Sequence, residues 1–278
     1  MKSGIALKFV LGLVWLAAVS AAGPLRAEDA HQDASQGANQ GVNQGAAQDA
    51  SQDANKVCEV PNSLLTTESP LPKVTEAVKS GHPLDVLVIG SRSSTILGSE
   101  ASAYPARLQA SLKEKLPQAK VNVSQEIQPK KTAEETASGL VKLMEAKKPT
   151  LVIWQTGTVD ALRSIDPDEF RNAVDEGVVA LQKAGADVIL MNPQYSPRTE
   201  MMISVPPYVD NMRAVAQQHD VPLFDRFAIM HHWHDQGDFD LFSTSHGIDL
   251  AKRVHDCLGR ALSQFVIEAA HLKSAQQN

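Results

Sequence analysis

The sequence predicts an α/β domain in which a parallel sheet of five strands carries helices on both faces. Short, almost wholly apolar runs such as "DVLVIG" at 85–90 alternate with longer stretches of helical periodicity from about residue 58 to 273. Strands that are apolar on both faces are typical of a buried parallel sheet, and strand–helix alternation is typical of the α/β class. The chain has 278 residues, 43% of them hydrophobic, which is enough for one good-sized core.

The five expected strands are short runs of large apolar residues, rich in β-branched side chains and flanked by turn or polar residues. In chain order they lie at 85–90, 120–124, 150–155, 186–191 and 221–224. Trp154 belongs to the third of these runs. We therefore expect its indole in the core rather than on a ligand surface.

The five expected helices carry apolar side chains at intervals of three and four residues, which places them on one helix face. In chain order they lie at 104–116, 132–146, 166–185, 206–219 and 247–270. Two of them have clear start signals. Thr132 and Glu135 have the spacing of a capping box, and Asp166 stands before Pro167 as an N-cap residue.

The residues before the domain have the composition of an export signal and a spacer. A short basic stretch and the apolar run "FVLGLVWLAAVSAA" precede small residues, so we expect a signal peptide over 1–27, with cleavage after Ala22 or Ala27. The alternative is an uncleaved membrane anchor. Residues 28–56 repeat Gln, Asn, Ala, Gly and Asp and predict a disordered linker before a folded domain at 57–278. The expected location is periplasmic or secreted in a bacterium, with no stable membrane span after cleavage.

The net charge argues against one class of binding partner, and the cysteine content predicts one disulfide. The net charge is −6 and no basic stripe occurs, so nucleic acid is not an expected partner. Cys58 and Cys257 are the two cysteines of the chain. In an exported protein two cysteines most simply form one disulfide, which here would close a loop of nearly the whole domain.

Functional side chains of a parallel sheet gather outside the carboxyl ends of its strands. The stretch "GSRSST" after the first strand lacks the glycine patterns of phosphate-binding loops, so a nucleotide cofactor is not expected. It offers instead Ser91, Ser93 and Ser94, while His246 stands just before the last helix. A serine in the first position and a histidine in the second can meet across this edge of the sheet, which is the arrangement needed for nucleophilic catalysis.

The order of these blocks resembles the SGNH/GDSL hydrolases, a group of flavodoxin-like esterases and lipases. "GSRSST", "PKKT", "GTVD" and "STSH" stand in the order of the four blocks of that family, and the resemblance spans roughly 84–262. It implies a flavodoxin-like, three-layer α/β/α fold and ester hydrolysis through a serine, without metal or other cofactor.

The first two blocks differ from the pattern of the family. Laying "SRSST" over Gly-Asp-Ser-Leu-Thr implies that Ser93 is the nucleophile. A register that keeps Gly90 as the glycine leaves Ser91 as the nearest hydroxyl. In the second block Lys130 replaces the family's glycine, and its backbone N–H would remain as a donor to an oxyanion.

The last two blocks also differ. In "GTVD", Val159 replaces an asparagine that donates a hydrogen bond, while Asp160 keeps the aspartate or, alternatively, caps the turn that follows. In "STSH", Ser243 replaces the aspartate that orients the histidine, so His246 would act as the base with another carboxylate near it. Losing one oxyanion donor typically costs about 100- to 1000-fold in rate.

Three functions therefore stay open. The first is an exported serine hydrolase that acts on an ester of an envelope glycan or on a small acyl ester, with Ser93, Ser91, His246, Lys130 and Asp160 as candidate catalytic residues. The main alternative is an impaired domain that binds an acylated glycan or an envelope partner without turnover. The third is a domain that keeps the fold for an assembly or structural role. The histidines of "MHHWH" show no third ligand nearby in the sequence, so no metal site is expected.

Overall fold

The computed structural model describes residues 58–242 and 247–274. The expected signal peptide, the expected linker and His246 lie outside these residues. All described residues belong to one compact unit. Within the described part of the chain, every helix is too short or too polar to cross a membrane.

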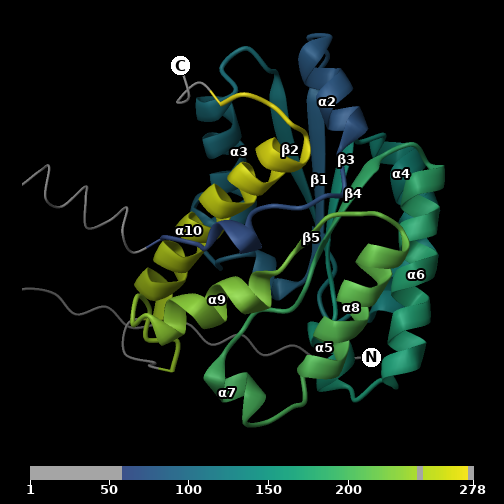
Figure 1. Cartoon of the computed structure of the whole chain (residues 1–278). Coiled ribbons are helices and arrows are strands. Elements are labelled where there is room, and N and C mark those ends of the chain that lie inside the picture. The colour runs from purple at the N-terminus through teal and green to yellow at the C-terminus, as the bar shows by residue number, and fades with distance from the viewer. Residues whose placement is uncertain (1–57, 243–246, 275–278) are drawn as a thin grey trace, which may run out of the picture. The chain divides into compact units, whose positions relative to one another are not determined.

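Five parallel strands form one sheet in the order β2-β1-β3-β4-β5. They are β1 (Leu84–Gly90), β2 (Val121–Ile127), β3 (Leu151–Gln155), β4 (Asp187–Met191) and β5 (Leu223–Phe224). Helices cover both faces of this sheet (Figure 1). The predicted fold class, a flavodoxin-like three-layer α/β/α domain, is confirmed.

The helices divide between the two faces. One face packs against α2 (Pro72–Lys79), α3 (Tyr104–Lys115), α9 (Arg226–Asp235) and α10 (Gly247–Ala269). The other packs against α4 (Ala133–Lys147), α6 (Pro167–Lys183) and α8 (Pro206–Gln218). Short helices α5 (Thr158–Leu162) and α7 (Pro197–Glu200) follow β3 and β4, at the carboxyl edge of the sheet (Figure 1).

Alternation along β1 shows why the sheet is buried on both sides. Val86 and Val88 belong to the core of the α3–α10 face, whereas Leu87 and Ile89 belong to the core of the α4–α6 face. All four are buried. Successive side chains of a strand point to opposite faces, so an unbroken apolar run is what a strand between two helical layers requires.

Each of the ten expected elements is present, with shifted ends. The capping box of Thr132 and Glu135 is formed at the start of α4, and the Asp166 side chain caps α6. Trp154 is buried, as expected. The fifth strand is shorter than expected, and α2 and α9 were not among the expected helices. The Asp187 carboxylate, at the start of β4, accepts a hydrogen bond from the Val74 backbone N–H, which fixes the first turn of α2.

The predicted disulfide between Cys58 and Cys257 is formed, with the two Cα atoms 5.2 Å apart. It joins the first described residue to α10. Close by, α10 packs tightly on α3, because Gly259 leaves room for a neighbouring backbone. A Cβ at position 259 would lie 2.8 Å from the backbone N of Leu108, closer than real side chains approach.

Candidate functional site

Three serine hydroxyls lie at the carboxyl end of β1. The chain leaves the strand at Gly90 and turns through a short 3₁₀ helix, Arg92–Ser94. Ser94 is buried, while Ser91 and Ser93 are partly exposed. A side chain at position 90 would overlap the Ser94 hydroxyl in its present orientation, so glycine here leaves room for that hydroxyl. The nearest β3 residue at this edge is Gln155.

The amide of Gln155 holds all three hydroxyls. Its Oε1 accepts hydrogen bonds from Ser94 Oγ at 2.5 Å and Ser93 Oγ at 3.3 Å, and its Nε2 donates to Ser91 Oγ at 3.4 Å. Ser91 and Ser93 also contact each other through their hydroxyls at 3.3 Å. A neutral amide can orient a hydroxyl but cannot take its proton. Gln155 is therefore a positioning residue, and the base must come from elsewhere.

A buried arginine completes the site. Arg226, the first residue of α9, is only 1% exposed. Its Nη1 donates to Ser93 Oγ at 3.3 Å, and its Nη2 donates to the Ser93 carbonyl at 3.2 Å and to Gln194 Oε1 at 3.1 Å. Burial lowers the pKa of the guanidinium to about 10, so the group keeps its charge at neutral pH.

The groups around this cation are neutral. Burial raises the pKa of Tyr104, whose ring centre lies 5.7 Å from the Arg226 guanidinium. Burial, and secondarily the charge of Arg226, lowers the pKa of His255 to about 3. The neutral imidazole accepts a hydrogen bond at Nδ1 from the Tyr104 backbone N–H at 3.0 Å. The described side chains that contact Arg226, those of Ser93, Gln194 and Tyr104, are thus uncharged.

The first turn of α9 is held in place by its N-cap residue, Asp225. Its Oδ1 accepts from the Ala228 backbone N–H at 2.9 Å and from the Asn192 amide at 2.7 Å. Its Oδ2 pairs with Arg213 at 2.6 Å. These contacts tie α9 to the end of β4 and to α8, and so fix where the Arg226 side chain begins.

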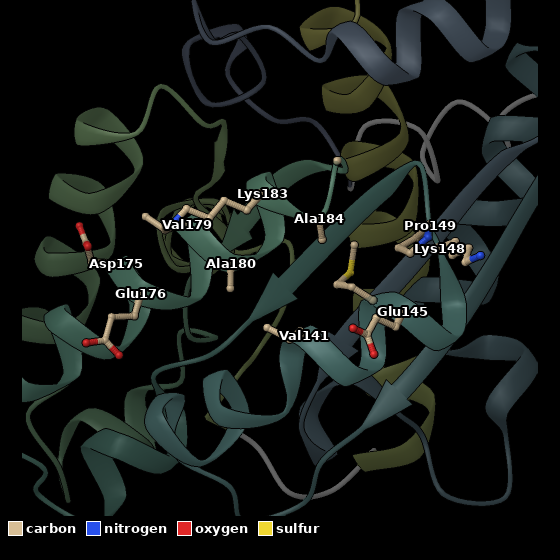
Figure 2. A pocket seen from close by; sticks show the side chains of 12 residues that line it. Val141, Glu145, Lys148, Pro149, Asp175, Glu176, Val179, Ala180, Lys183 and Ala184 are labelled. Atoms are coloured by element: carbon tan, nitrogen blue, oxygen red, sulfur yellow. The ribbon is translucent and has the colours of Figure 1, made fainter.

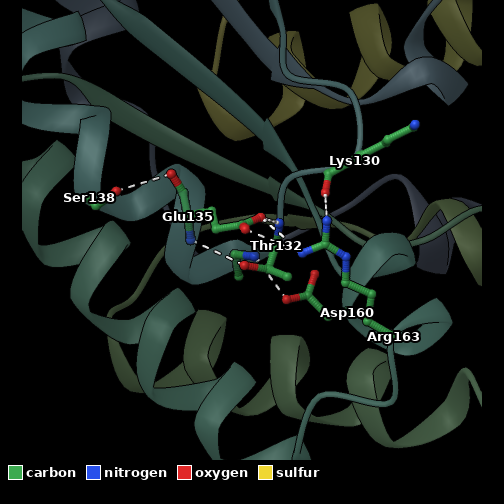
Figure 3. A network of polar contacts seen from close by, with 7 residues as sticks. Lys130, Thr132, Glu135, Ser138, Asp160 and Arg163 are labelled. Atoms are coloured by element: carbon green, nitrogen blue, oxygen red, sulfur yellow. Dashed lines mark hydrogen bonds and ion pairs between the residues drawn. The ribbon is translucent and has the colours of Figure 1, made fainter.

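The structure brings together Ser91 and Ser93 but places Lys130 and Asp160 in a different network (Figure 3). Asp160 is buried and accepts a hydrogen bond from the Ala133 backbone N–H at 2.8 Å, at the start of α4. Its burial raises the pKa of the carboxyl, and this hydrogen bond opposes the shift. The Lys130 carbonyl accepts from Arg163 Nη2 at 2.7 Å. The two residues thus join the β2–α4 connection to α5.

Lys130 has the backbone conformation of the glycine it replaces. Its φ is +65°, in the left-handed region that favours glycine. Its side chain is exposed and points away from the network in Figure 3.

The small cavity at the serine site is separate from a larger groove between α4 and α6. A cavity of about 10 Å³ lies at the carboxyl edge and is lined by Ser91, Gln155 and Val159 among others. That volume suits about one water molecule. A groove of about 900 Å³ runs between α4 and α6 (Figure 2). Because its lining includes Pro149 and Gly185, which precede β3 and β4, the groove opens at the opposite edge from Ser93.

Several exposed large apolar side chains stand in segments that follow strands or short helices at the carboxyl edge. Leu97 follows the serine turn and is 89% exposed, and Met201 and Met202 follow α7 and are 77% and 75% exposed. Phe242 and Ile248, on either side of the residues outside the description, are also exposed. The Arg198 guanidinium of α7 lies 5.3 Å from the centre of the Phe242 ring. This contact places Phe242 beside α7, the helix that Met201 and Met202 follow. We refer to these five residues as the apolar rim.

The histidines of α9 contact aromatic and acidic side chains. His231 pairs with Asp235 at 2.9 Å and packs edge-on against Tyr195. Among the described residues, no three His, Cys, Asp or Glu side chains are arranged to bind a metal ion.

Sequence reasoning missed the roles of Arg226 and Gln155, although both stand at strand ends. Their position at strand ends, where functional side chains gather, was the only feature of the sequence that could have pointed to them. Nothing local indicates that Arg226 reaches across the sheet to Ser93, because that contact joins residues 133 positions apart.

Several solved structures have the same fold. The chain is 21% identical to TesA over 64% of this chain and 97% of that one, with a TM-score of 0.51. It is 16% identical to a catalytic mutant of Axe2, an acetylxylan esterase from Geobacillus stearothermophilus, over 67% and 95%, with a TM-score of 0.55. It is 19% identical to LAE5, an alpha/beta hydrolase from the metagenome of Lake Arreo, over 66% and 96%, with a TM-score of 0.52. At this level of identity the likeness shows the fold.

No curated protein matches the chain. A family model does match it, over residues 57–272, and this range includes every element of the described domain. The match confirms the resemblance to a divergent SGNH-type hydrolase. It follows from this match that the chain belongs to the Non-GDSL lipase-like family.

Proposed function

We propose that this protein is an exported serine hydrolase that cleaves an ester, with Ser93 as nucleophile and His246 as general base. The observation that carries the proposal is the setting of Ser93 Oγ. Ser93 is partly exposed at the carboxyl edge, and its hydroxyl is oriented by Gln155 at 3.3 Å and contacted by the Arg226 cation at 3.3 Å. A fixed hydroxyl beside a positive charge is suited to nucleophilic attack, because the charge favours the alkoxide.

Ser93 is a better candidate than Ser91 because of their partners. The Ser93 hydroxyl accepts from a guanidinium, whereas the Ser91 hydroxyl accepts from the neutral Gln155 amide. The hydrogen bond between them, at 3.3 Å, keeps Ser91 within reach as an alternative nucleophile.

The flanks of His246 support its proposed role. On one side Phe242 contacts Arg198 of α7, and on the other α10 begins at Gly247. Both flanks lie at the carboxyl edge, on the same side of the sheet as Ser93. In this proposal the imidazole takes the Ser93 proton during attack and returns it to the leaving alcohol.

The apolar rim favours an ester with an apolar acyl group. Apolar side chains as exposed as Leu97 and Met201 commonly mark a binding surface when they cluster. The alcohol part of the ester is proposed to belong to an envelope glycan or a small molecule. Export through a signal at 1–27, followed by a linker at 28–56, is part of the proposal, and the Cys58–Cys257 disulfide supports an oxidising location.

A second candidate is a binding domain without turnover. It is favoured by Val159, which lines the small cavity at the carboxyl edge and offers no hydrogen-bond donor there. In that case Ser93 would contact a bound ester without forming a covalent bond to it.

Labelling with a fluorophosphonate distinguishes the two candidates. The mature protein and the variants Ser93→Ala, Ser91→Ala and His246→Ala are treated with the probe, and the adduct is located by peptide mass spectrometry. Ser138→Ala, an exposed serine of α4, serves as the matched control. We expect an adduct on Ser93 that requires His246, together with hydrolysis of p-nitrophenyl esters. An adduct on Ser91 would show that Ser91, and not Ser93, is the nucleophile. Absence of any adduct would favour the second candidate, a binding domain without turnover.

A further inference from the structure

Arg226 carries a buried charge for which the described residues provide no counter-ion. Its three hydrogen bonds go to uncharged oxygens, of Ser93 and of Gln194. No carboxylate of the described residues forms an ion pair with it, and its Nε has no hydrogen-bond partner there. Buried arginines are normally paired with an acid, since an unpaired charge in a protein interior is strongly unfavourable.

Other arginines of this chain show the usual arrangement. Arg213 and Arg163 are both exposed; Arg213 pairs with Asp225 at 2.6 Å, and Arg163 pairs with Glu135 at 3.2 Å. Arg226 is more buried than either and lacks such a partner among the described residues. The simplest account is that its negative partner is present only during the reaction.

We propose that Arg226 is a catalytic residue that binds the oxyanion formed when Ser93 attacks the ester carbonyl. This inference rests on the proposed function. It assigns to a guanidinium the hydrogen bond that the asparagine of the related hydrolases would donate and that Val159 cannot.

The charge changes of the reaction fit this role. Ser93 Oγ forms a bond to the carbonyl carbon while its proton passes to the base, and the π electrons of the C=O bond move to the carbonyl oxygen. The negative charge is then cancelled by Arg226. When the C=O bond re-forms, the bond to the alcohol oxygen breaks, and the alcohol leaves with the proton from the base. A water molecule releases the acyl group by the same steps.

The geometry places the donor beside the reacting atom. Nη1 lies 3.3 Å from Ser93 Oγ, so an oxygen bonded to the carbon under attack by Oγ comes within hydrogen-bond distance of the guanidinium. Nη2 is held by the Ser93 carbonyl and by Gln194, which fixes the plane of the group. A donor that is already oriented requires little reorganisation in the transition state.

Kinetics of Arg226→Gln and Arg226→Lys test the inference, with Arg171→Gln, an exposed arginine of α6, as the matched control. For a p-nitrophenyl ester we expect Arg226→Gln to lower kcat by about 100- to 1000-fold with KM changed by less than about threefold. Arg226→Lys keeps the positive charge but lacks the paired N–H groups of the guanidinium, so its kcat should fall less than that of Arg226→Gln. Circular dichroism and thermal unfolding confirm that each variant is folded.

Binding of phenylboronic acid gives a second measurement that needs no turnover. Its adduct with a serine is a tetrahedral anion, and we expect Arg226→Gln to weaken its binding by about 100-fold or more. If wild-type protein is labelled on Ser93 and hydrolyses esters while Arg226→Gln keeps kcat and boronate affinity within about tenfold, only the role of Arg226 is overturned. If wild-type protein neither reacts with fluorophosphonate nor binds the boronate, the proposed function fails, and this inference fails with it.

Discussion

His255 offers a test of how the neutral surroundings of the site are maintained. The pKa of this buried imidazole falls from its ordinary 6.5 to about 3, mainly because of burial and in part because of the Arg226 charge. Its Nδ1 accepts the Tyr104 backbone N–H at 3.0 Å, and a protonated ring could not accept that hydrogen bond. We therefore expect the neutral imidazole to be retained in the folded state well below neutral pH.

The size of the effect follows from linkage between protonation and folding. Because the folded pKa is depressed, acid favours the unfolded state, so stability is lost as pH falls from 6.5 toward 3. At pH 5 the unfolded imidazole is about 97% protonated while the folded one is almost wholly neutral, which corresponds to about 2 kcal/mol of lost stability. A folded pKa one unit higher would change this figure little, since the fold would still bind almost no proton at that pH.

The perturbation is His255→Asn, in which the amide oxygen can accept the Tyr104 N–H and cannot be protonated in this range. Urea unfolding of wild type and variant is measured near pH 7.5 and near pH 5. Any offset in stability caused by the substitution itself cancels in the difference between the two pH values. We expect wild type to lose about 2 kcal/mol more than the variant between the two conditions. Equal losses would refute the reasoning, because they would show that His255 is not held neutral.

Three further predictions follow from the same contacts. Gln155→Leu removes the amide that orients three hydroxyls, so we expect a loss of about 1 to 3 kcal/mol in urea unfolding and a fall in kcat for an ester substrate. Unchanged stability and rate would show that the serines are held without it. Replacing both Cys58 and Cys257 by serine opens a loop of 199 residues, which the loop-entropy model values at roughly 5 kcal/mol at most. Calorimetry of oxidised wild type against this variant measures the loss, and a difference below about 1 kcal/mol would contradict the model. Met201→Ser with Met202→Ser should raise KM for an octanoyl ester by several-fold and leave the acetyl ester nearly unchanged, because each buried CH₂ contributes about 0.8 kcal/mol. Equal effects on both esters would exclude the apolar rim as an acyl-binding surface.

The layers of the fold were predictable because their signals are local. An unbroken apolar run such as 85–90 and a capping box such as that of Thr132 report on adjacent residues, and the structure contains both elements. The helix α2 was missed because its start depends on Asp187, 113 residues away from Val74. The short β5 also departs from expectation, since only Leu223 and Phe224 of the expected 221–224 run pair with β4.

The candidate site was predictable in part. The serines after β1 could be identified by position, and the sequence alone could not choose between Ser91 and Ser93. Lys130 and Asp160 were grouped with them by block order, yet their hydrogen bonds join the start of α4 to α5. Block order tells which strand end a residue follows, but not which neighbours its side chain contacts.

The class of fold, the order of the ten expected elements and the turn that presents the serines could be predicted from the sequence, because periodicity, composition and turn chemistry are read over a few residues. The disulfide partners could be predicted because the chain has two cysteines. Only the tertiary structure decided which charge faces Ser93. The Arg226 contact joins residues 133 positions apart, and the contact of Tyr104 with His255 joins residues 151 positions apart. Such contacts depend on the spatial order of the strands in the sheet and on which face of the sheet each helix covers. No local sequence pattern specifies either of these.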